Sequence, residues 1–161
     1  MEWIATAAYG LEGVLAQELR DLGLEVGLVQ TSRVAFSGTP LDGCRANLHL
    51  RTAGHVRLVV GRFSAATFDG LFEGVRALPW ADYLPQDAAF PVTARCITSQ
   101  LMSVPDCQAI VKKAIVEKLR QTYRQSWFPE KGPLFPVEVH LWKDEATLSI
   151  DTSGTPLHQQ I

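Results

Sequence analysis

The sequence predicts an α+β protein built from two successive parts. Short β segments alternate with amphipathic helices along the whole chain, and the first 65 residues follow the order βαββαβ. The chain has 161 residues, of which 47% are hydrophobic and 20% are charged, so it is long and apolar enough to bury a core. We therefore expect one domain, or two small domains that share an interface.

The first predicted elements are a strand at residues 2–8 and a helix that follows Gly10. Apolar residues recur in this helix at intervals of three and four, which predicts one buried stripe. The residues of this stripe are Leu11, Val14, Leu15, Leu19 and Leu22. Gly23 follows the last of them, at the position where a left-handed C-terminal cap is favoured.

Two β segments at residues 25–30 and 32–37 come next and are expected to form a hairpin. A second helix begins after Thr39, because a capping hydroxyl followed by Pro40 is typical of a helix start. Its inner face is predicted to comprise Leu41, Cys44 and Leu48. A strand at residues 55–63 completes the βαββαβ order, which is that of ferredoxin-like folds, where two helices cover one face of an antiparallel sheet.

The second part begins with a helix at residues 68–78, whose end is set by the proline that follows it. A strand at residues 89–97 and a longer helix from residue 104 to about residue 124 come next. Residues 135–142 and 146–150 are predicted to form a hairpin. The pattern of the second part is therefore also a mixture of helices and strands.

The long helix has an apolar side and a basic side. At ~100° per residue, its apolar residues gather on one side. They are Cys107, Ile110, Val111, Ala114, Ile115 and Leu119. Lys113, Arg120 and Arg124 fall together on the other side, and Ser103 with Asp106 matches a capping box at the start. This basic side is either a solvated face, on which Lys113 can pair with Glu117, or a surface that meets RNA phosphates.

The overall charge does not by itself indicate a nucleic-acid-binding protein, since the formal net charge is −2 and the pI is about 6.1. The distribution is more informative, because all five lysines lie in the last third and residues 101–131 hold six basic against three acidic side chains. The candidate RNA-binding residues are Arg95, Lys112, Lys113, Lys118, Arg120, Arg124, Lys131 and Lys143. Such cations contribute affinity and salt dependence rather than base specificity.

No motif for catalysis is found. The sequence has no P-loop, glycine-rich dinucleotide fingerprint or zinc-protease motif, and its three cysteines show no Cys-x-x-Cys spacing. Asp151, Thr152, Ser153 and His158 include the residue types of a catalytic triad, but their closeness indicates a turn. We assign no catalytic, cofactor-binding or metal-ligating residue, and the absence of a signal segment or a long apolar run favours a cytoplasmic protein.

Several stretches in a fixed order carry a family resemblance. They are residues 7–12, 45–48, 50–53, 74–80, 103–108, 111–116, 139–141 and 148–154. Together they resemble the bacterial ribosomal RNA guanine-N2 methyltransferases, a family also catalogued as N6-adenine-specific DNA methylases. The resemblance implies a ferredoxin-like subdomain at residues 1–65 and a THUMP domain at residues 66–161. It also implies a methyltransferase domain, using S-adenosylmethionine, that we expect to be absent from this chain.

The resemblance implies a module that binds structured RNA and presents it to the methyltransferase domain of the same polypeptide. Ribosomal RNA of the large subunit, modified at guanine N2, is a more strongly implied target than tRNA. The chain alone is then expected to have no enzymatic activity. The alternative is a structural or dimerisation module without direct RNA contact, which the near-neutral charge and the apolar residues Trp127 and Phe128 favour.

Overall fold

The structure is a computed structural model that describes residues 1–152. The described residues divide into two compact units, one comprising Met1–Val59 with Asp151 and Thr152, the other Val60–Ile150. Each unit has its own hydrophobic core. The domain boundary predicted at residue 65 stays a prediction. Ser153 and His158, two of the four residues expected to form a turn, lie outside the described residues.

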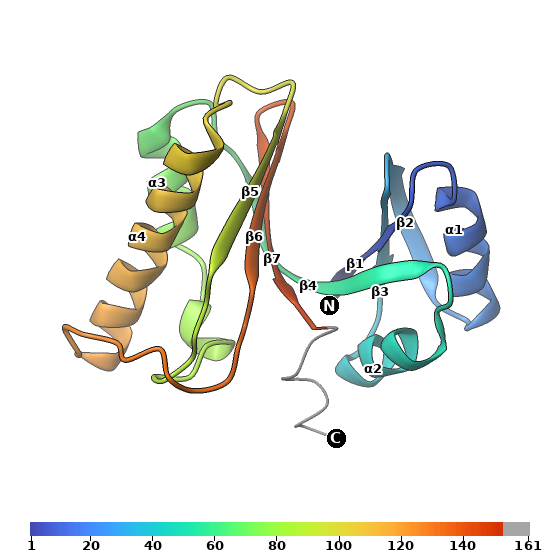
Figure 1. The fold of residues 1–161 in the computed structure, drawn as a ribbon, viewed down its shortest axis with the longest axis horizontal. Helices are drawn as coiled ribbons and strands as arrows, with labels where there is room; N and C mark the ends of the chain where they lie inside the picture. Colours follow the sequence, from blue (N-terminus) through green and yellow to red (C-terminus); the bar gives the residue numbers. More distant parts are fainter. Residues whose placement is uncertain (153–161) are drawn as a thin grey trace. The chain divides into compact units, whose positions relative to one another are not determined.

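The first unit has the βαββαβ order that the sequence predicts. Its elements are β1 (Glu2–Ala7), α1 (Glu12–Asp21), β2 (Glu25–Gln30), β3 (Arg33–Ser37), α2 (Pro40–His49) and the first part of β4 (Ala53–Ser64) (Figure 1). The strands lie in the order β2-β3-β1-β4, and each neighbouring pair is antiparallel. The predicted hairpin of β2 and β3 is therefore confirmed.

Both helices of this unit pack on the same face of its sheet. Leu15 and Leu19 of α1 and Ala46 of α2 share one core cluster with Trp3 of β1 and Phe36 of β3. The two aromatic rings are stacked, with 6.3 Å between their centroids. Burying side chains of this size is the main source of stability for a unit of about 60 residues.

The inner face predicted for α2 is wrong for Leu41 and Leu48, whereas Cys44 is partly buried. Leu41 and Leu48 are 70% and 66% exposed, and the buried positions of the helix are Gly43 and Ala46. The reason is the Trp3 ring, because a Cβ added at Gly43 would lie 2.3 Å from Trp3 Cη2. The helix therefore turns its smallest residues toward the bulky ring and leaves its leucines at the surface.

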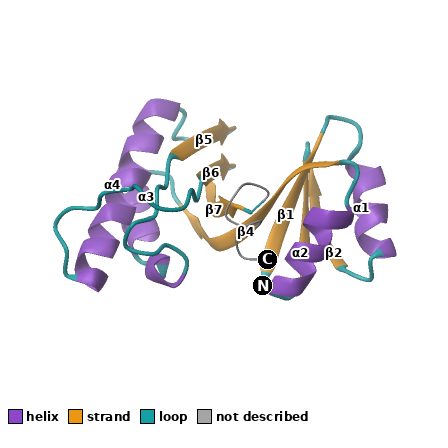
Figure 2. Cartoon of the chain, turned by 60° about the horizontal axis from the view of Figure 1, so that its bottom comes forward, coloured by secondary structure: helices purple, strands orange, loops and turns teal. Residues whose placement is uncertain are grey.

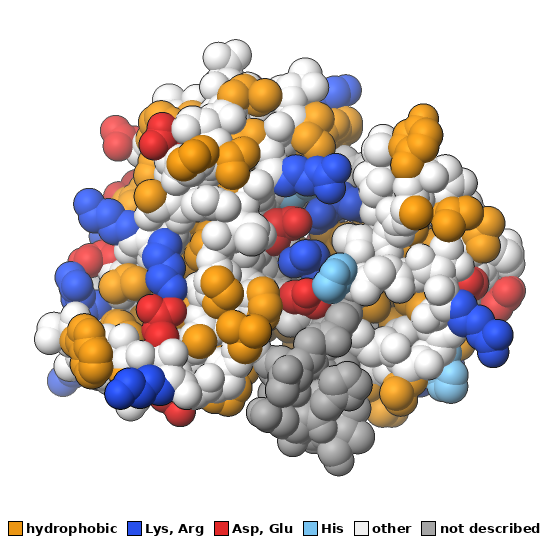
Figure 3. Space-filling view, in the orientation of Figure 1, with side chains coloured by type: hydrophobic (Ala, Val, Ile, Leu, Met, Phe, Trp, Pro, Cys, Tyr) orange, Lys and Arg blue, Asp and Glu red, His pale blue; other side chains and the backbone are white. Residues whose placement is uncertain are grey.

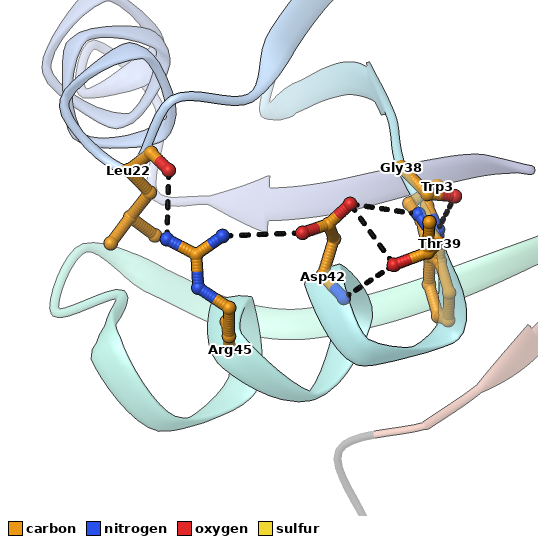
Figure 4. A network of polar contacts seen from close by, with 6 residues as sticks. All are labelled: Trp3, Leu22, Gly38, Thr39, Asp42 and Arg45. Carbon is orange, nitrogen blue, oxygen red and sulfur yellow. Dashed lines mark hydrogen bonds and ion pairs between the residues drawn. The ribbon is translucent and has the colours of Figure 1, made fainter.

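A capping box fixes the start of α2, as Figure 4 shows. The N–H of Asp42 donates to Thr39 Oγ1 at 3.2 Å, and the N–H of Thr39 donates to Asp42 Oδ2 at 2.9 Å. Arg45 pairs with Asp42 Oδ1 at 3.2 Å and donates to the carbonyl of Leu22 at 2.8 Å, which joins α2 to the end of α1. The hydrogen bond from the Thr39 N–H is the strongest influence that lowers the pKa of Asp42.

The second unit continues β4 with five further elements and a short 3₁₀ turn. They are α3 (Phe68–Arg76), η1 (Trp80–Asp82), β5 (Val92–Ile97), α4 (Val104–Tyr123), β6 (Val137–Trp142) and β7 (Glu145–Asp151). The strand order is β4-β7-β6-β5, in which β6 is antiparallel to β7 and parallel to β5. The strand predicted from residue 89 begins three residues later, because Pro91 cannot donate to a ladder and Ala89 forms only an isolated bridge with Leu134.

Helices α3 and α4 lie side by side against one face of this sheet (Figure 2). Trp80 is fully buried below them, and its Nε1–H donates to the carbonyl of Val75 at 2.7 Å, so the polar end of the ring is satisfied. Gly74 weakens α3 intrinsically, but a Cβ there would lie 2.2 Å from Phe63 Cε2. The glycine thus permits close packing of α3 on β4. Within residues 1–152, no helix combines the length and the apolar character that crossing a membrane requires.

Candidate nucleic-acid interface

Helix α4 positions most of the predicted RNA-binding residues. Its buried residues are Cys107, Val111, Ala114, Ile115 and Leu119, which confirms the predicted apolar side, although Ile110 is only partly buried. Lys113 and Arg120 are exposed on the opposite side, and Arg124 is exposed directly after the end of the helix. We call these three residues the basic face of α4. In Figure 3, Lys and Arg side chains alternate with acidic ones over the region of this helix.

The two ends of α4 are built differently. The capping box predicted at its start is wrong, because the side chain of Ser103 makes no capping hydrogen bond. Pro105 stands in the first turn and removes one of the N–H groups that a cap would satisfy. At the other end, Arg124 adopts a left-handed conformation with φ 54°, which terminates the helix and leads the chain into the loop before β6.

One acidic residue interrupts the basic face. Glu117 does not pair with Lys113, as the alternative interpretation supposed, but with Arg120, at 3.5 Å between Oε2 and Nη1. Both side chains are more than one third exposed, so this ion pair contributes at most about 1 kcal/mol. Among the described residues, Lys113 has neither a hydrogen bond nor an ion pair at its ammonium group. Both cations can therefore meet a phosphate at little cost.

Lys112 is held by the protein itself. Its Nζ lies 2.6 Å from Glu130 Oε1, donates to the carbonyl of Phe90 at 2.9 Å and stands 3.6 Å from the centroid of the Phe90 ring. Glu130 also accepts from the N–H of Phe90 at 3.2 Å. Burial opposes the ionisation of Glu130, but the hydrogen bonds from Lys112 and Phe90 and the charge of Lys112 outweigh it and lower the pKa of Glu130. Lys112 therefore has a clear structural role.

The other two cations near α4 differ in their placement. Lys118 is partly buried and, at ~100° per residue, lies about 140° around the helix from Lys113. It therefore stands outside the basic face. Lys131 is exposed in the loop between α4 and β6, which begins at Arg124. Its neighbour Glu130 pairs with Lys112, so Lys131 follows the point at which this loop contacts the middle of α4.

Two predicted residues are separated from this group. Lys143 lies in the turn between β6 and β7, 4.7 Å from the centroid of the Trp142 ring, and this turn is bonded to residue 100, just before α4 begins. Since α4 has 20 residues, its two ends are about 30 Å apart. Arg95 is exposed on β5, where Ala94 and Cys96 pack on the core, so alternation places Arg95 on the sheet face turned away from α4.

The loop after α4 presents an aromatic ring that was not among the predicted RNA contacts. Trp127 is 69% exposed, whereas Trp3 and Trp80 are buried. The neighbouring Phe128 is buried and packs edge-on against Tyr123 of α4, with 6.5 Å between the ring centroids. The only sequence signal was an apolar residue in a polar, basic segment, and it was assigned to a protein interface rather than to RNA.

No nucleophile or metal site is evident in the described part of the chain. The Cys96 and Cys107 sulfurs lie 3.9 Å apart between β5 and α4, and burial, followed by the neighbouring Cys96, raises the pKa of the Cys107 thiol to about 12. A thiol with this pKa is protonated at neutral pH and is a poor nucleophile. Within residues 1–152, no three His, Cys, Asp or Glu side chains gather in a way that could hold a metal ion.

The fold and the charges define a ferredoxin-like unit followed by an α/β unit that exposes a basic helix face. Residues 65–151 match the THUMP domain model, and residues 2–57 match the model of the RlmL ferredoxin-like domain. The chain belongs to the THUMP domain family, since that match spans more than half of its length. The predicted fold class is confirmed.

Curated proteins with methyltransferase names are similar over almost the whole chain. A Bacillus subtilis (strain 168) protein provisionally named RNA methyltransferase YpsC is 48% identical over 98% of this chain. The ribosomal RNA large subunit methyltransferase K/L of Pseudomonas putida (strain GB-1) is 38% identical over 99% of it. The chain spans only 41% and 22% of the lengths of these two relatives.

A solved structure with a methyltransferase name is also similar to this chain. A provisionally named methyltransferase crystallised with SAH has a TM-score of 0.86 and 45% sequence identity to this chain. The match covers 93% of this chain and 41% of that one.

Proposed function

We propose that the chain binds structured RNA through the basic face of α4 and presents it to a methyltransferase domain of the same polypeptide. The observation that carries this proposal is that Lys113 and Arg120 fall on one exposed side of α4, with Arg124 exposed directly after its last residue. From residue 113 to residue 124 the helix rises about 16 Å. At about 3.4 Å of duplex axis per charge on one strand, this length corresponds to roughly four to five phosphates of that strand.

The proposed RNA substrate and methyl donor follow from the names of the similar proteins. We propose large-subunit ribosomal RNA as the substrate, because one relative is named for that activity, with guanine N2 as the modified atom. S-adenosylmethionine is the proposed methyl donor of the whole protein, and the solved neighbour that holds SAH supports this choice. Such a protein would act in the cytoplasm, where ribosomal RNA is exposed to it.

The test measures fluorescence anisotropy of a labelled hairpin from large-subunit ribosomal RNA, with a tRNA and a DNA duplex of equal length as comparisons. Replacing Lys113 or Arg120 by glutamine is expected to weaken RNA binding and to lower the slope of log affinity against log salt by about one unit each. The matched control is Arg20→Gln, which removes an exposed cation from α1 in the other unit and should leave the slope unchanged.

Glu117 offers a variant with the opposite effect. Glu117→Gln removes a negative charge from the basic face and frees Arg120 from its ion pair, so RNA affinity should rise. A structural or dimerisation module has no reason to respond in this way. If no RNA binds even at low salt, and light scattering shows that the chain self-associates, the proposal is wrong and the structural alternative is favoured.

A further inference from the structure

We infer that Trp127, which lies between Arg124 and Lys131 in the sequence, is a stacking site for an unpaired nucleotide of the bound RNA. This inference rests on the proposed RNA binding but assigns a distinct subsite, located in the loop between α4 and β6. It also adds a different kind of contact, because the basic face binds phosphates whereas an indole ring recognises the flat face of a base.

The exposure of Trp127 distinguishes it from the other tryptophans. Trp3 stacks on Phe36, Trp80 is buried and hydrogen-bonded, and the ring of Trp142 lies beneath the ammonium group of Lys143. The ring of Trp127 is 69% exposed and, among the described residues, makes no hydrogen bond or aromatic contact. The flat apolar face of this indole is therefore open to a stacking partner.

The loop holds the backbone of Trp127 in a defined place. On one side, Arg124 ends α4, and Gln125 donates from Nε2 to the carbonyl of Trp127 at 2.5 Å. On the other side, the adjacent Phe128 is buried against Tyr123, whose hydroxyl donates to the carbonyl of Leu84 at 2.7 Å. Because the backbone is held next to a buried anchor, only the side-chain rotation of Trp127 has to be restricted when a base stacks on it.

The surrounding charges favour a nucleotide over an apolar partner. Arg124 and Lys131 are exposed on either side of Trp127 in the sequence, and Arg120 lies one turn before Arg124 on α4. Glu130 is the only acidic residue between positions 124 and 131, and its charge is paired with Lys112. In the space-filling view, hydrophobic atoms at the lower left, where Figure 1 places the end of α4 and the loop after it, are bordered by Lys and Arg side chains (Figure 3).

The neighbours of Trp127 in the chain do not extend its apolar surface. Ser126 and Gln125 are polar, and Phe128 is turned into the core. A protein partner usually requires a wider apolar patch, whereas a single exposed ring in a loop that also exposes two cations suits one stacked base with its phosphates. An unpaired nucleotide next to a duplex would meet the ring and the basic face of α4 in one continuous strand.

The test uses the whole chain and two labelled RNA hairpins that differ only in a single-stranded extension of four nucleotides at the 3′ end. Wild type is expected to bind the extended hairpin at least about fivefold more tightly than the blunt one. Trp127→Ala should abolish this advantage and leave the affinity for the blunt hairpin unchanged. Trp127→Phe should retain most of the advantage, because a phenyl ring can also stack on a base.

The outcomes separate this inference from the proposed function. Binding of the blunt hairpin reports the phosphate contacts, whereas the difference between the hairpins reports stacking on Trp127. Equal affinity of wild type for both hairpins, or an equal loss for both in Trp127→Ala, overturns the stacking site and leaves RNA binding in place. A wild type that binds neither hairpin overturns both proposals. Loss of self-association in Trp127→Ala, without any change in the advantage of the extension, assigns the ring to a protein contact instead.

Discussion

Lys112 and Glu130 form an ion pair of 2.6 Å that joins the middle of α4 to the loop before β6. The same ammonium group lies over the Phe90 ring, so three separate segments meet at one lysine. This arrangement divides the predicted cations into two kinds. Lys112 stabilises the unit, whereas Lys113, its neighbour in the sequence, is exposed and available to a ligand.

Lys112→Met tests this division. The methionine keeps the aliphatic bulk but loses the ion pair, the hydrogen bond to Phe90 and the cation–π contact, so the free energy of unfolding should fall by about 1–2 kcal/mol. Lys113→Met is the matched control and should change it by less than about 0.5 kcal/mol. Thermal denaturation of both variants checks this prediction. Equal stability of the two variants would show that Lys112 is as dispensable as its neighbour.

Acid should weaken the same contact. The folded state lowers the pKa of Glu130 below its usual value of 4.5, because the hydrogen bonds from Lys112 and Phe90 together with the charge of Lys112 outweigh the effect of burial. The stabilisation is therefore present above about pH 4.5 and is lost as the pH falls through the lower pKa of the folded state. Glu130→Gln should be less stable than wild type at pH 7 and approach it as the pH falls through the lowered pKa of Glu130. A constant difference across this range would exclude ionisation of Glu130 as its source.

Gly43→Ala should destabilise the first unit despite the higher helix propensity of alanine. The new Cβ would lie 2.3 Å from Trp3 Cη2, so either the ring or the helix must shift, at a cost of about 1–3 kcal/mol. Gly13→Ala is the control, since a Cβ added there in α1 meets no atom within 4 Å. That variant should gain up to about 1 kcal/mol from propensity alone. Urea denaturation of the two variants should give shifts of opposite sign, and shifts of the same sign would contradict this account.

Gly43 also shows which features of the fold sequence patterns can predict. The patterns predicted the βαββαβ order, the hairpins and the apolar side of α4, because these depend on local periodicity and on a strong contrast between apolar and charged residues. They failed for α2 because its inner face is made of small residues that fit around Trp3, a contact between positions 40 residues apart. Hydrophobicity favours leucine for an inner face, but packing against a large ring requires glycine and alanine.

The buried stripe predicted for α1 contains a smaller error of the same kind. Leu11 and Val14 have the spacing of a buried stripe, yet they are 42% and 53% exposed, and Ala16 takes a buried place beside Leu15 and Leu19. Spacing fixes which residues share a side of a helix, but it does not fix which part of that side the sheet covers.

The candidate interface was predictable only in part. Composition located the basic segment, and helical periodicity grouped Lys113, Arg120 and Arg124. It could not show that Lys112 is paired with Glu130, since that contact depends on how the loop returns to the helix. Nor could it show that Arg95 lies on the sheet face turned away from α4, because the face depends on which side of β5 the helices cover.

In the first unit, Glu18 ties α1 to the loop between α2 and β4. Its carboxylate accepts hydrogen bonds from the hydroxyl and N–H of Thr52 and from the N–H of Arg51. The hydroxyl of Thr52 is the strongest influence that lowers the pKa of Glu18, so this stabilisation is present above about pH 4.5 and is lost as the pH falls through the lower folded value.

Glu18→Gln replaces one acceptor oxygen by a donor, which cannot accept from these groups, and should cost about 1 kcal/mol at pH 7 because the site is partly exposed. Glu25→Gln, at an exposed position of β2, removes the same charge and should be nearly neutral. Denaturation at pH 7 and at a series of lower pH values checks both variants. The Glu18 variant should approach wild type as the pH falls through the lowered pKa of Glu18, since the carboxylate that makes it different then becomes protonated in wild type as well. A difference that persists undiminished down to the lowest pH at which wild type folds would mean that the shape of the side chain, rather than its charge, holds the loop.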